Sequence, residues 1–234
     1  IYLNKLMETK DVDYIIASDT DSVYITFDKL VNKLFKEGTE TKKIVNFLDT
    51  VAKEKLEPFI NNSYEVLAKE MNAYDQKMVM AREVIADKAI WTAKKRYILN
   101  VWDSEGVRYK EPKLKIMGIE AVKSSTPAPC RDKIKEALKI IINGDEKQLN
   151  NFIQEFREEF MTLSPEEISF PRSCNGIKKY TGESSLYAKG APIAVKGAIL
   201  YNFLIKKNKL SGKFPFINEG DKVRFVNMKQ PNIY

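Results

Sequence analysis

Two apolar runs separated by a polar segment near the start of the chain predict a β-hairpin. Residues 14–17 and 23–27 are two runs rich in β-branched and aromatic side chains, and Ser18-Asp19-Thr20-Asp21-Ser22 lies between them. Such runs on either side of short polar residues are typical of two strands joined by a tight turn. The turn would bring the carboxylates of Asp19 and Asp21 close to one point.

Apolar residues at helical spacing predict the longer helices of the chain. The predicted ranges are 42–74, 128–142, 146–161 and 192–206. We expect Pro58 to kink or divide the first helix, because proline cannot donate the backbone hydrogen bond of a helix interior. Ser124-Ser125-Thr126-Pro127 has the pattern of a helix cap followed by proline, and Asn143-Gly144 is typical of a left-handed helix end.

Between the first two helices, β-branched and aromatic residues predict strands. The predicted strands are 79–85, 90–91, 97–102 and 114–117, with a turn at Asp103-Ser104-Glu105-Gly106. Short strands are also predicted after the last helix, near 221–226. Strand-rich sequence gives way to helix-rich sequence near Gly118, which predicts two domains, 1–118 and 119–234. The predicted fold class is α+β: a partial antiparallel sheet with a packed helix, followed by a mainly helical domain.

The composition of the 234-residue chain excludes several kinds of catalytic site. It contains no histidine, which excludes Ser-His-Asp and Cys-His catalysis and histidine-ligated zinc. Cys130 and Cys174 cannot supply a four-cysteine zinc site or a disulfide framework, so we expect a reduced intracellular compartment. No apolar run approaches ~20 residues and no basic leader opens the chain, so we expect neither a membrane span nor secretion.

Charge is distributed unevenly along the chain, whose formal net charge is +7. The balance of Lys and Arg against Asp and Glu is −3 in residues 1–74 and +6 in residues 75–140. It is −4 in residues 141–175 and +8 in residues 176–234. Two basic blocks therefore accompany an acidic start, as expected of a protein that binds a polyanion such as nucleic acid. A lysine-rich surface that serves only solubility is the alternative.

Asp19 and Asp21 are candidate metal ligands. Two carboxylates that converge at a turn repel each other unless a cation lies nearby, and hard oxygen ligands suit Mg²⁺ or Mn²⁺. By itself, however, an Asp-x-Asp turn is more often a solvated turn than a metal site. Further motifs are needed to decide between these alternatives.

Four sequence blocks resemble motifs of the family B DNA polymerases, particularly those of T-even-like bacteriophages. Residues 14–24 resemble the Asp-Thr-Asp-Ser motif of the polymerase palm, the domain that holds the catalytic metals. The blocks that follow in the family's order are Arg82-Glu83 with Ile85, Lys94-Lys95-Arg96-Tyr97 with its flanks, and Lys113–Glu120 with Lys123-Ser124-Ser125-Thr126-Pro127. The resemblance is close up to about Ile142, and residues 193–202 still resemble the polymerase thumb. It implies that 1–118 is the C-terminal part of a palm and 119–234 a truncated thumb.

The resemblance implies a two-metal active site for template-directed nucleotidyl transfer. Asp21 would be a direct ligand of two Mg²⁺ or Mn²⁺ ions about 4 Å apart, with Asp19 a close neighbour and Glu83 a further catalytic carboxylate. The implied substrates are primer–template DNA and deoxynucleoside triphosphates. Thr20 and Ser22 are expected to shape the turn by hydrogen bonding to their own backbone. For Glu83, a surface or salt-bridged strand residue remains the alternative.

The resemblance also implies residues that bind DNA without sequence preference. The primer-binding residues would be Lys94, Lys95, Arg96 and Tyr97. Because side chains alternate along a strand, Lys95 and Tyr97 are expected to share the face that meets the duplex. The residues expected to contact backbone phosphates are Lys115, Lys123, Ser124 and Thr126. A helix N-terminus near Thr126 would assist this anion binding.

The chain also departs from the family pattern. Only 18 residues precede Asp19, whereas the family places another metal-ligating aspartate and the nucleotide-binding fingers before this motif. Ala81 stands where the family usually has aspartate, and Ser18 where glycine is commoner. We therefore expect a piece of a polymerase that is inactive alone. A second polymerase chain would carry the exonuclease, the fingers and the rest of the palm, in the cytoplasm of a phage-infected bacterium.

Two other functions stay open from the sequence. The chain could be a stand-alone, non-catalytic module that binds duplex DNA. It could also be a metal-dependent transferase that uses Asp-x-Asp to hold a nucleotide sugar, although no other feature supports that function. Metal-dependent primer extension on addition of a partner chain would separate a polymerase fragment from a binding module.

Overall fold

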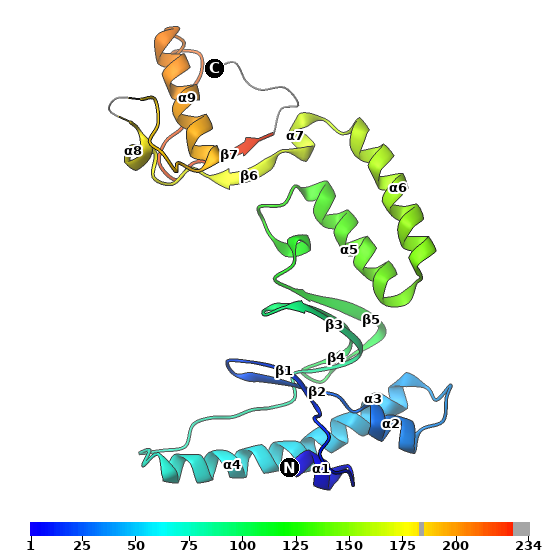
Figure 1. Cartoon of the computed structure of the whole chain (residues 1–234). Coiled ribbons are helices and arrows are strands. Elements are labelled where there is room, and N and C mark those ends of the chain that lie inside the picture. The colour runs from blue at the N-terminus through cyan, green and yellow to red at the C-terminus, as the bar shows by residue number, and fades with distance from the viewer. Residues whose placement is uncertain (183–184, 227–234) are drawn as a thin grey trace. The chain divides into compact units, whose positions relative to one another are not determined.

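Helices and small antiparallel sheets alternate along the chain in the computed structural model, which describes residues 1–182 and 185–226 (Figure 1). The chain forms two compact units, Ile1–Lys115 and Ile116–Tyr234. The α+β fold class predicted from the sequence is confirmed. Residues 227–234 of the predicted thumb lie outside the described residues, and the assignment of palm and thumb stays a prediction.

The predicted first hairpin is present. Strand β1 (Ile15–Asp19) pairs antiparallel with strand β2 (Ser22–Ile25), and Asp19 faces Ser22 in this register. Thr20 and Asp21 are therefore the two residues of the turn. Helices α1 (Tyr2–Leu6) and α2 (Asp28–Leu34) precede and follow the hairpin. They were not predicted, because helices this short show too little of the helical period.

A three-stranded sheet, in the order β3-β4-β5, packs against this hairpin. Its strands are β3 (Val84–Ala93), β4 (Arg96–Ser104) and β5 (Val107–Met117). The middle strand supplies a buried cluster of Tyr97, Leu99 and Val101, against which Tyr24 of β2 packs. The turn predicted at 103–106 is confirmed, since Glu105 and Gly106 join β4 to β5 with φ of 51° and 88°. Two-residue hairpin turns favour such left-handed residues.

Residues 79–83 were predicted to be part of a strand, and this prediction is wrong, because the strand begins at Val84. The backbone N–H of Arg82 donates instead to a carboxylate oxygen of Glu57 at 2.9 Å. The side chain of Arg82 binds Asp49 and Asp103. A segment whose polar groups are bound by side chains needs no neighbouring strand.

The helical region predicted over 42–74 changes from α-helical to π-helical hydrogen bonding just before Pro58. Helix α3 (Thr41–Val51) continues through a π-helical turn, Ala52–Leu56, into helix α4 (Glu57–Glu70). Proline clashes with the carbonyl four residues earlier in an α-helix and cannot donate a hydrogen bond. The wider hydrogen bonding of a π-helical turn accommodates this defect, so the helix is divided at the predicted place without ending.

The second unit contains a short 3-10 helix, Glu120–Val122, three longer α-helices, two short ones and a two-stranded sheet in its described part. The helices are α5 (Ala128–Asn143), α6 (Glu146–Thr162), α7 (Pro165–Ile168), α8 (Ile177–Tyr180) and α9 (Ile193–Lys207). Strands β6 (Phe170–Ser173) and β7 (Lys222–Phe225) pair antiparallel. Cys174 is fully buried with Ala194 and Ala198 of α9, which gives this part of the unit a small apolar core.

Two predicted helix ends differ from those observed. The residue before α5 is Pro127, which has no side-chain hydrogen bond to the helix, so Thr126 is not the cap. Gly144 at the end of α5 is extended, with φ −107°, and not left-handed. A Cβ atom at Gly144 would collide with Oε1 of Gln148, the side chain that caps α6 together with Asp145. A larger residue here would have to displace the end of the Gln148 side chain, whereas the φ of −107° lies outside the left-handed region that favours glycine.

The helices were also compared with the requirements of a membrane span. Among residues 1–182 and 185–226, no helix combines the length and the apolar character that crossing a bilayer requires.

Candidate active site

The turn between β1 and β2 presents the two candidate carboxylates. Asp21 is exposed and Asp19 is half-buried at the end of β1. The hydroxyl of Ser22 donates to the backbone carbonyl of Asp19 at 3.1 Å, while the hydroxyl of Thr20 donates to the Asp19 carboxylate at 3.2 Å. Thr20 has a φ of 52°, which is uncommon for a β-branched residue and marks a strained turn.

The two carboxylates of this turn line different cavities of the first unit. Asp19 lines a cavity of about 210 Å³ between the β1-β2 and β3-β4 hairpins, together with Tyr97 and Lys95. Asp21 lines a larger groove of about 550 Å³, which Glu83 and Lys115 also line. The structure thus groups Asp21 with Glu83 and groups Asp19 with the lysines.

The donor chemistry of the turn suits a divalent cation, because carboxylate oxygens are preferred ligands of Mg²⁺ and Mn²⁺. The set of ligands is incomplete, however. Among the described residues, no group of three or more Asp, Glu, Cys or His side chains is placed to hold a metal ion. Asp19 and Asp21 therefore supply two carboxylates of the kind that Mg²⁺ and Mn²⁺ prefer, without a third such ligand grouped with them among the described residues.

Lys94 and Lys95 form the two-residue turn between β3 and β4, in the gap between the strands predicted at 90–91 and 97–102. Ala93 pairs with Arg96 across this turn, and Lys95 has a φ of 60°. Lys95 therefore does not lie in a strand, so strand alternation does not place it on the face of Tyr97, although both residues line the same cavity. Both lysines are exposed, whereas Arg96 is half-buried and Tyr97 belongs to the buried core.

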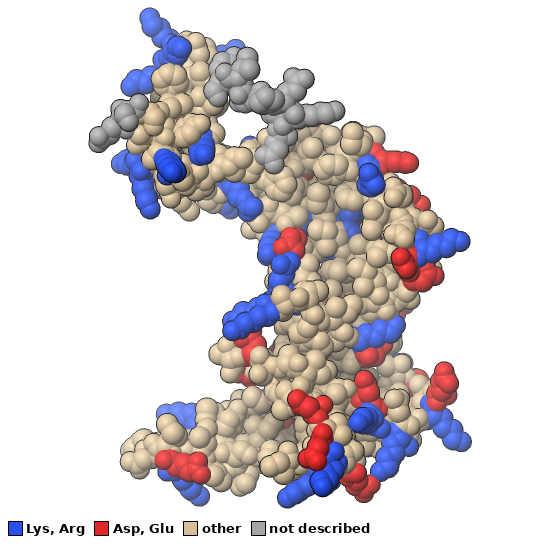
Figure 2. All heavy atoms as spheres, viewed as in Figure 1, with Lys and Arg blue, Asp and Glu red and all other residues tan. Residues whose placement is uncertain are grey.

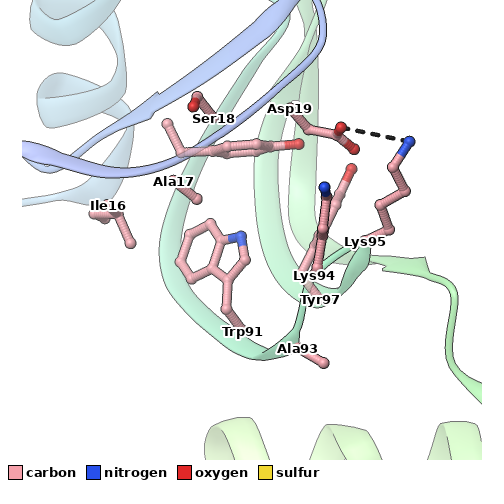
Figure 3. A pocket seen from close by; sticks show the side chains of 10 residues that line it. Ile16, Ala17, Ser18, Asp19, Trp91, Ala93, Lys94, Lys95 and Tyr97 are labelled. Atoms are coloured by element: carbon pink, nitrogen blue, oxygen red, sulfur yellow. Dashed lines mark ion pairs between the residues drawn. The ribbon is translucent and has the colours of Figure 1, made fainter.

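Lys95 is the residue that connects the two hairpins. Its Nζ lies 3.5 Å from Oδ1 of Asp19. Figure 3 shows the Asp19 carboxylate and the Lys95 ammonium group facing each other directly, with Lys94 and Tyr97 next to the pair and Trp91 farther away. An aspartate and a lysine that are distant in the sequence thus form one ion pair beside the candidate metal turn.

Aromatic packing holds this cavity in shape. The ring of Tyr24 makes edge contacts with Trp91 and Tyr97, each with centroids 5.4 Å apart. Burial raises the pKa of Tyr97 far above its usual value, and the neighbouring Tyr24 hydroxyl and the charges of Glu83 and Asp19 add to the increase. Tyr97 therefore stays a neutral hydroxyl at any physiological pH.

Glu83 precedes β3 and forms an ion pair with Lys115 of β5. Glu83 is exposed and Lys115 half-buried, so the pair lies at the surface of the groove that Asp21 lines. The Glu83 carboxylate is thus salt-bridged, which was the alternative foreseen for it, and Glu83 also lines the groove that Asp21 lines. It also engages Lys115, which was predicted to contact phosphate.

The other predicted phosphate contacts lie in the second unit. Lys123 forms an ion pair with Glu120 at 3.0 Å, Ser124 is exposed and Thr126 is half-buried. Helix α5 begins two residues after Thr126, and Pro129 in its first turn lacks an N–H group. The helix N-terminus expected near Thr126 is therefore present, and Pro129 leaves it with one donor fewer.

Sequence reasoning missed a buried network of charges beside the groove. The Nε and Nη2 atoms of Arg82 lie 3.0 and 2.7 Å from Oδ1 of Asp49, and Nη1 binds Asp103. Nε of Arg108 lies 2.9 Å from Oδ2 of Asp103, and Nη2 lies 3.1 Å from Oδ2 of Asp49. Asp103 is completely buried. Arg82, the residue before Glu83, thereby joins Asp49 of α3 to Asp103 of the sheet.

Comparison with known proteins identifies what this chain resembles as a whole. Over 99% of its length it is 36% identical to a DNA-directed DNA polymerase of Escherichia phage RB69. Over the same share it is 34% identical to a DNA-directed DNA polymerase of Enterobacteria phage T4. The resemblance to the DNA polymerases of T-even-like phages is confirmed. No family model matches the chain.

The chain spans about a quarter of the length of these phage polymerases, 26% of each. The resemblance extends through the second unit, where the motifs alone had indicated a weaker match. The similarity to the phage polymerases therefore supports the interpretation of the Asp-x-Asp hairpin as part of a polymerase.

Proposed function

We propose that the chain is the part of a DNA-directed DNA polymerase that supplies one catalytic carboxylate pair and grips the primer–template duplex. The observation that carries this proposal is the contact between the Asp19-Thr20-Asp21 turn and the Lys94-Lys95 turn. A carboxylate turn next to exposed cations suits an enzyme that holds metal ions beside phosphates. The similarity of nearly the whole chain to two phage polymerases supports this function.

The catalytic roles follow from the positions of the carboxylates. We assign Asp21 as a ligand of two Mg²⁺ or Mn²⁺ ions, which would activate the primer 3′-hydroxyl and stabilise the leaving pyrophosphate of the incoming deoxynucleotide. Asp19 would set the charge beside them, and Glu83 would add a carboxylate from the groove it shares with Asp21. The strained turn at Thr20 separates Asp19, which lines the smaller cavity, from Asp21, which lines the larger groove.

Grip on the duplex is assigned to exposed cations. Lys94 and Lys95 project from a hairpin turn, where they can reach phosphates of any sequence. In the second unit, Lys and Arg side chains are spread over the region of α8, α9 and β7, where few acidic side chains are visible on this face (Figure 2). These features fit a family B palm over 1–118 and a thumb over 119–234.

The described residues contain no set of three metal ligands, and the chain spans 26% of the length of each phage polymerase. We propose that the missing carboxylate, the nucleotide-binding fingers and the exonuclease are supplied by the remaining part of the polymerase, as a second chain or as more of the same polypeptide. The enzyme would then act in the cytoplasm of the infected bacterium.

Two observations favour the alternative of a non-catalytic DNA-binding module: Asp19 is bound to a lysine, and no set of three ligands among the described residues surrounds the turn. Primer extension by this chain together with the remaining polymerase separates the two functions. We expect Mg²⁺-dependent extension that Asp21→Asn lowers by about a thousandfold or more, equivalent to roughly 4 kcal/mol. Duplex binding should survive this substitution. Equal extension by both proteins would contradict the catalytic assignment of Asp21.

A further inference from the structure

The ion pair between Asp19 and Lys95 has consequences for how DNA is bound. Lys95 extends from the β3-β4 turn, and its ammonium group is the partner of the carboxylate at the end of β1. Asp19 is the only carboxylate among the residues that line the cavity between the two hairpins. Lys94, the other residue of the same turn, forms no ion pair with any residue in the described part of the chain.

Both members of the pair can change partners easily. The Lys95 side chain is 63% exposed and that of Asp19 is 35% exposed. An ion pair this accessible contributes little to stability, because water solvates both groups and salt screens them. Lys95 can therefore leave Asp19 for a phosphate at small cost, and it needs only a side-chain rotation to do so.

One ammonium group cannot neutralise a carboxylate and a phosphate equally well at the same time. We propose that Asp19 withholds Lys95 from the DNA backbone, so that loss of the negative charge on Asp19 releases Lys95 to grip the duplex. This inference rests on the proposed function and adds a regulation of the same site. A divalent cation on the carboxylate would remove the same interaction, which couples occupancy of the metal turn to the hold on DNA.

Such coupling is reciprocal. If neutralising Asp19 strengthens the binding of DNA through Lys95, then bound DNA must favour the neutralised carboxylate by the same factor. The polymerase would thus grip its duplex most firmly when its catalytic turn carries a cation, and it would hold DNA more loosely otherwise.

A double-mutant cycle on the chain itself tests this proposal. Binding of a fluorescent primer–template duplex is measured by anisotropy, at low salt and without divalent cations, for the wild type, Asp19→Asn, Lys95→Gln and the double variant. Asparagine keeps an Oδ1 acceptor for the Thr20 hydroxyl, so the turn is preserved. Asp19→Asn should lower the dissociation constant of the duplex complex by a larger factor in the wild type than in the Lys95→Gln background. We expect these two factors to differ by about 1.5-fold to fivefold.

The salt dependence and a matched variant complete the test. Asp19→Asn should steepen the log–log salt slope by up to about 0.9, the value for one added phosphate contact, only when Lys95 is present. Lys94→Gln, from the same turn, should leave the effect of Asp19→Asn unchanged. An equal effect of Asp19→Asn in both Lys95 backgrounds would show simple charge repulsion and overturn the coupling. Failure of every variant to bind the duplex would instead overturn the proposed grip on DNA.

Discussion

Replacement of Arg82 by methionine should destabilise the first unit strongly. The Arg82 side chain is 9% exposed and binds Asp49 and Asp103, of which Asp103 is fully buried. Removing one member of a buried ion pair costs about 3–5 kcal/mol, because the other charge is left without its partner. Arg108 and Lys53 still contact the two carboxylates, so we expect the lower value, about 3 kcal/mol.

Tryptophan fluorescence makes this prediction specific to the first unit. The chain has two tryptophans, Trp91 and Trp102, and both lie in this unit. With an m value of about 1.5 kcal/mol per molar urea, a loss of 3 kcal/mol moves the unfolding midpoint by about 2 M. Arg108→Met is the control, since the 36%-exposed Arg108 contacts the same carboxylates.

We expect Arg108→Met to cost about 1 kcal/mol, because a more exposed ion pair contributes less. If both variants shift the midpoint equally, or if Arg82→Met shifts it by less than about 0.5 M, burial of Arg82 does not control the stability of this unit. Circular dichroism of the native proteins checks that each variant is folded before urea is added.

Three further outcomes are expected. Purified alone, the chain should incorporate no nucleotide above a metal-free control in a primer-extension assay, because its described residues provide an incomplete metal site; template-dependent extension by the chain alone would contradict this. Combined replacement of Lys94 and Lys95 by alanine should lower the log–log salt slope of duplex binding by up to about 1.8, and an unchanged slope would show that the turn does not touch DNA. Burial raises the pKa of Asp49, but hydrogen bonds from Lys53 and Arg82 outweigh it and lower the pKa below the ordinary 3.8. Asp49 therefore stabilises the fold above about pH 4 and this stability is lost as the pH falls further, so urea midpoints should decline more steeply between about pH 5 and 3 in the wild type than in Asp49→Asn.

Helices and hairpins whose stabilising contacts join residues close together in the sequence could be predicted well. The β1-β2 hairpin follows from two short apolar runs around a polar turn, and α6 follows from its apolar spacing. Hydrogen bonds and side-chain contacts within such elements join residues only a few positions apart, so the sequence pattern carries most of the information. The same holds for the turn at Glu105-Gly106, where glycine signals the backbone conformation.

The turn at Lys94-Lys95 could not be predicted in this way. Neither residue is Gly, Asn or Asp, the usual signals of a two-residue turn, and the flanking residues are typical of a strand. The place of the turn is decided by pairing of Trp91 with Tyr97 and by packing of both on Tyr24 of the other hairpin. Those contacts exist only when distant parts of the chain meet.

The sequence by itself therefore determined the α+β class, the main helices and the hairpin that presents Asp19 and Asp21. Only the tertiary structure decided that Asp19 faces Lys95, that Asp21 shares a groove with Glu83, and that Arg82 joins two buried carboxylates. The periodicity of a segment shows which of its faces is buried. It does not show which charged residue from a distant segment will lie next to a charge on that segment. A charge meets its partner through the packing of whole elements, and that packing is set by burial of apolar surface.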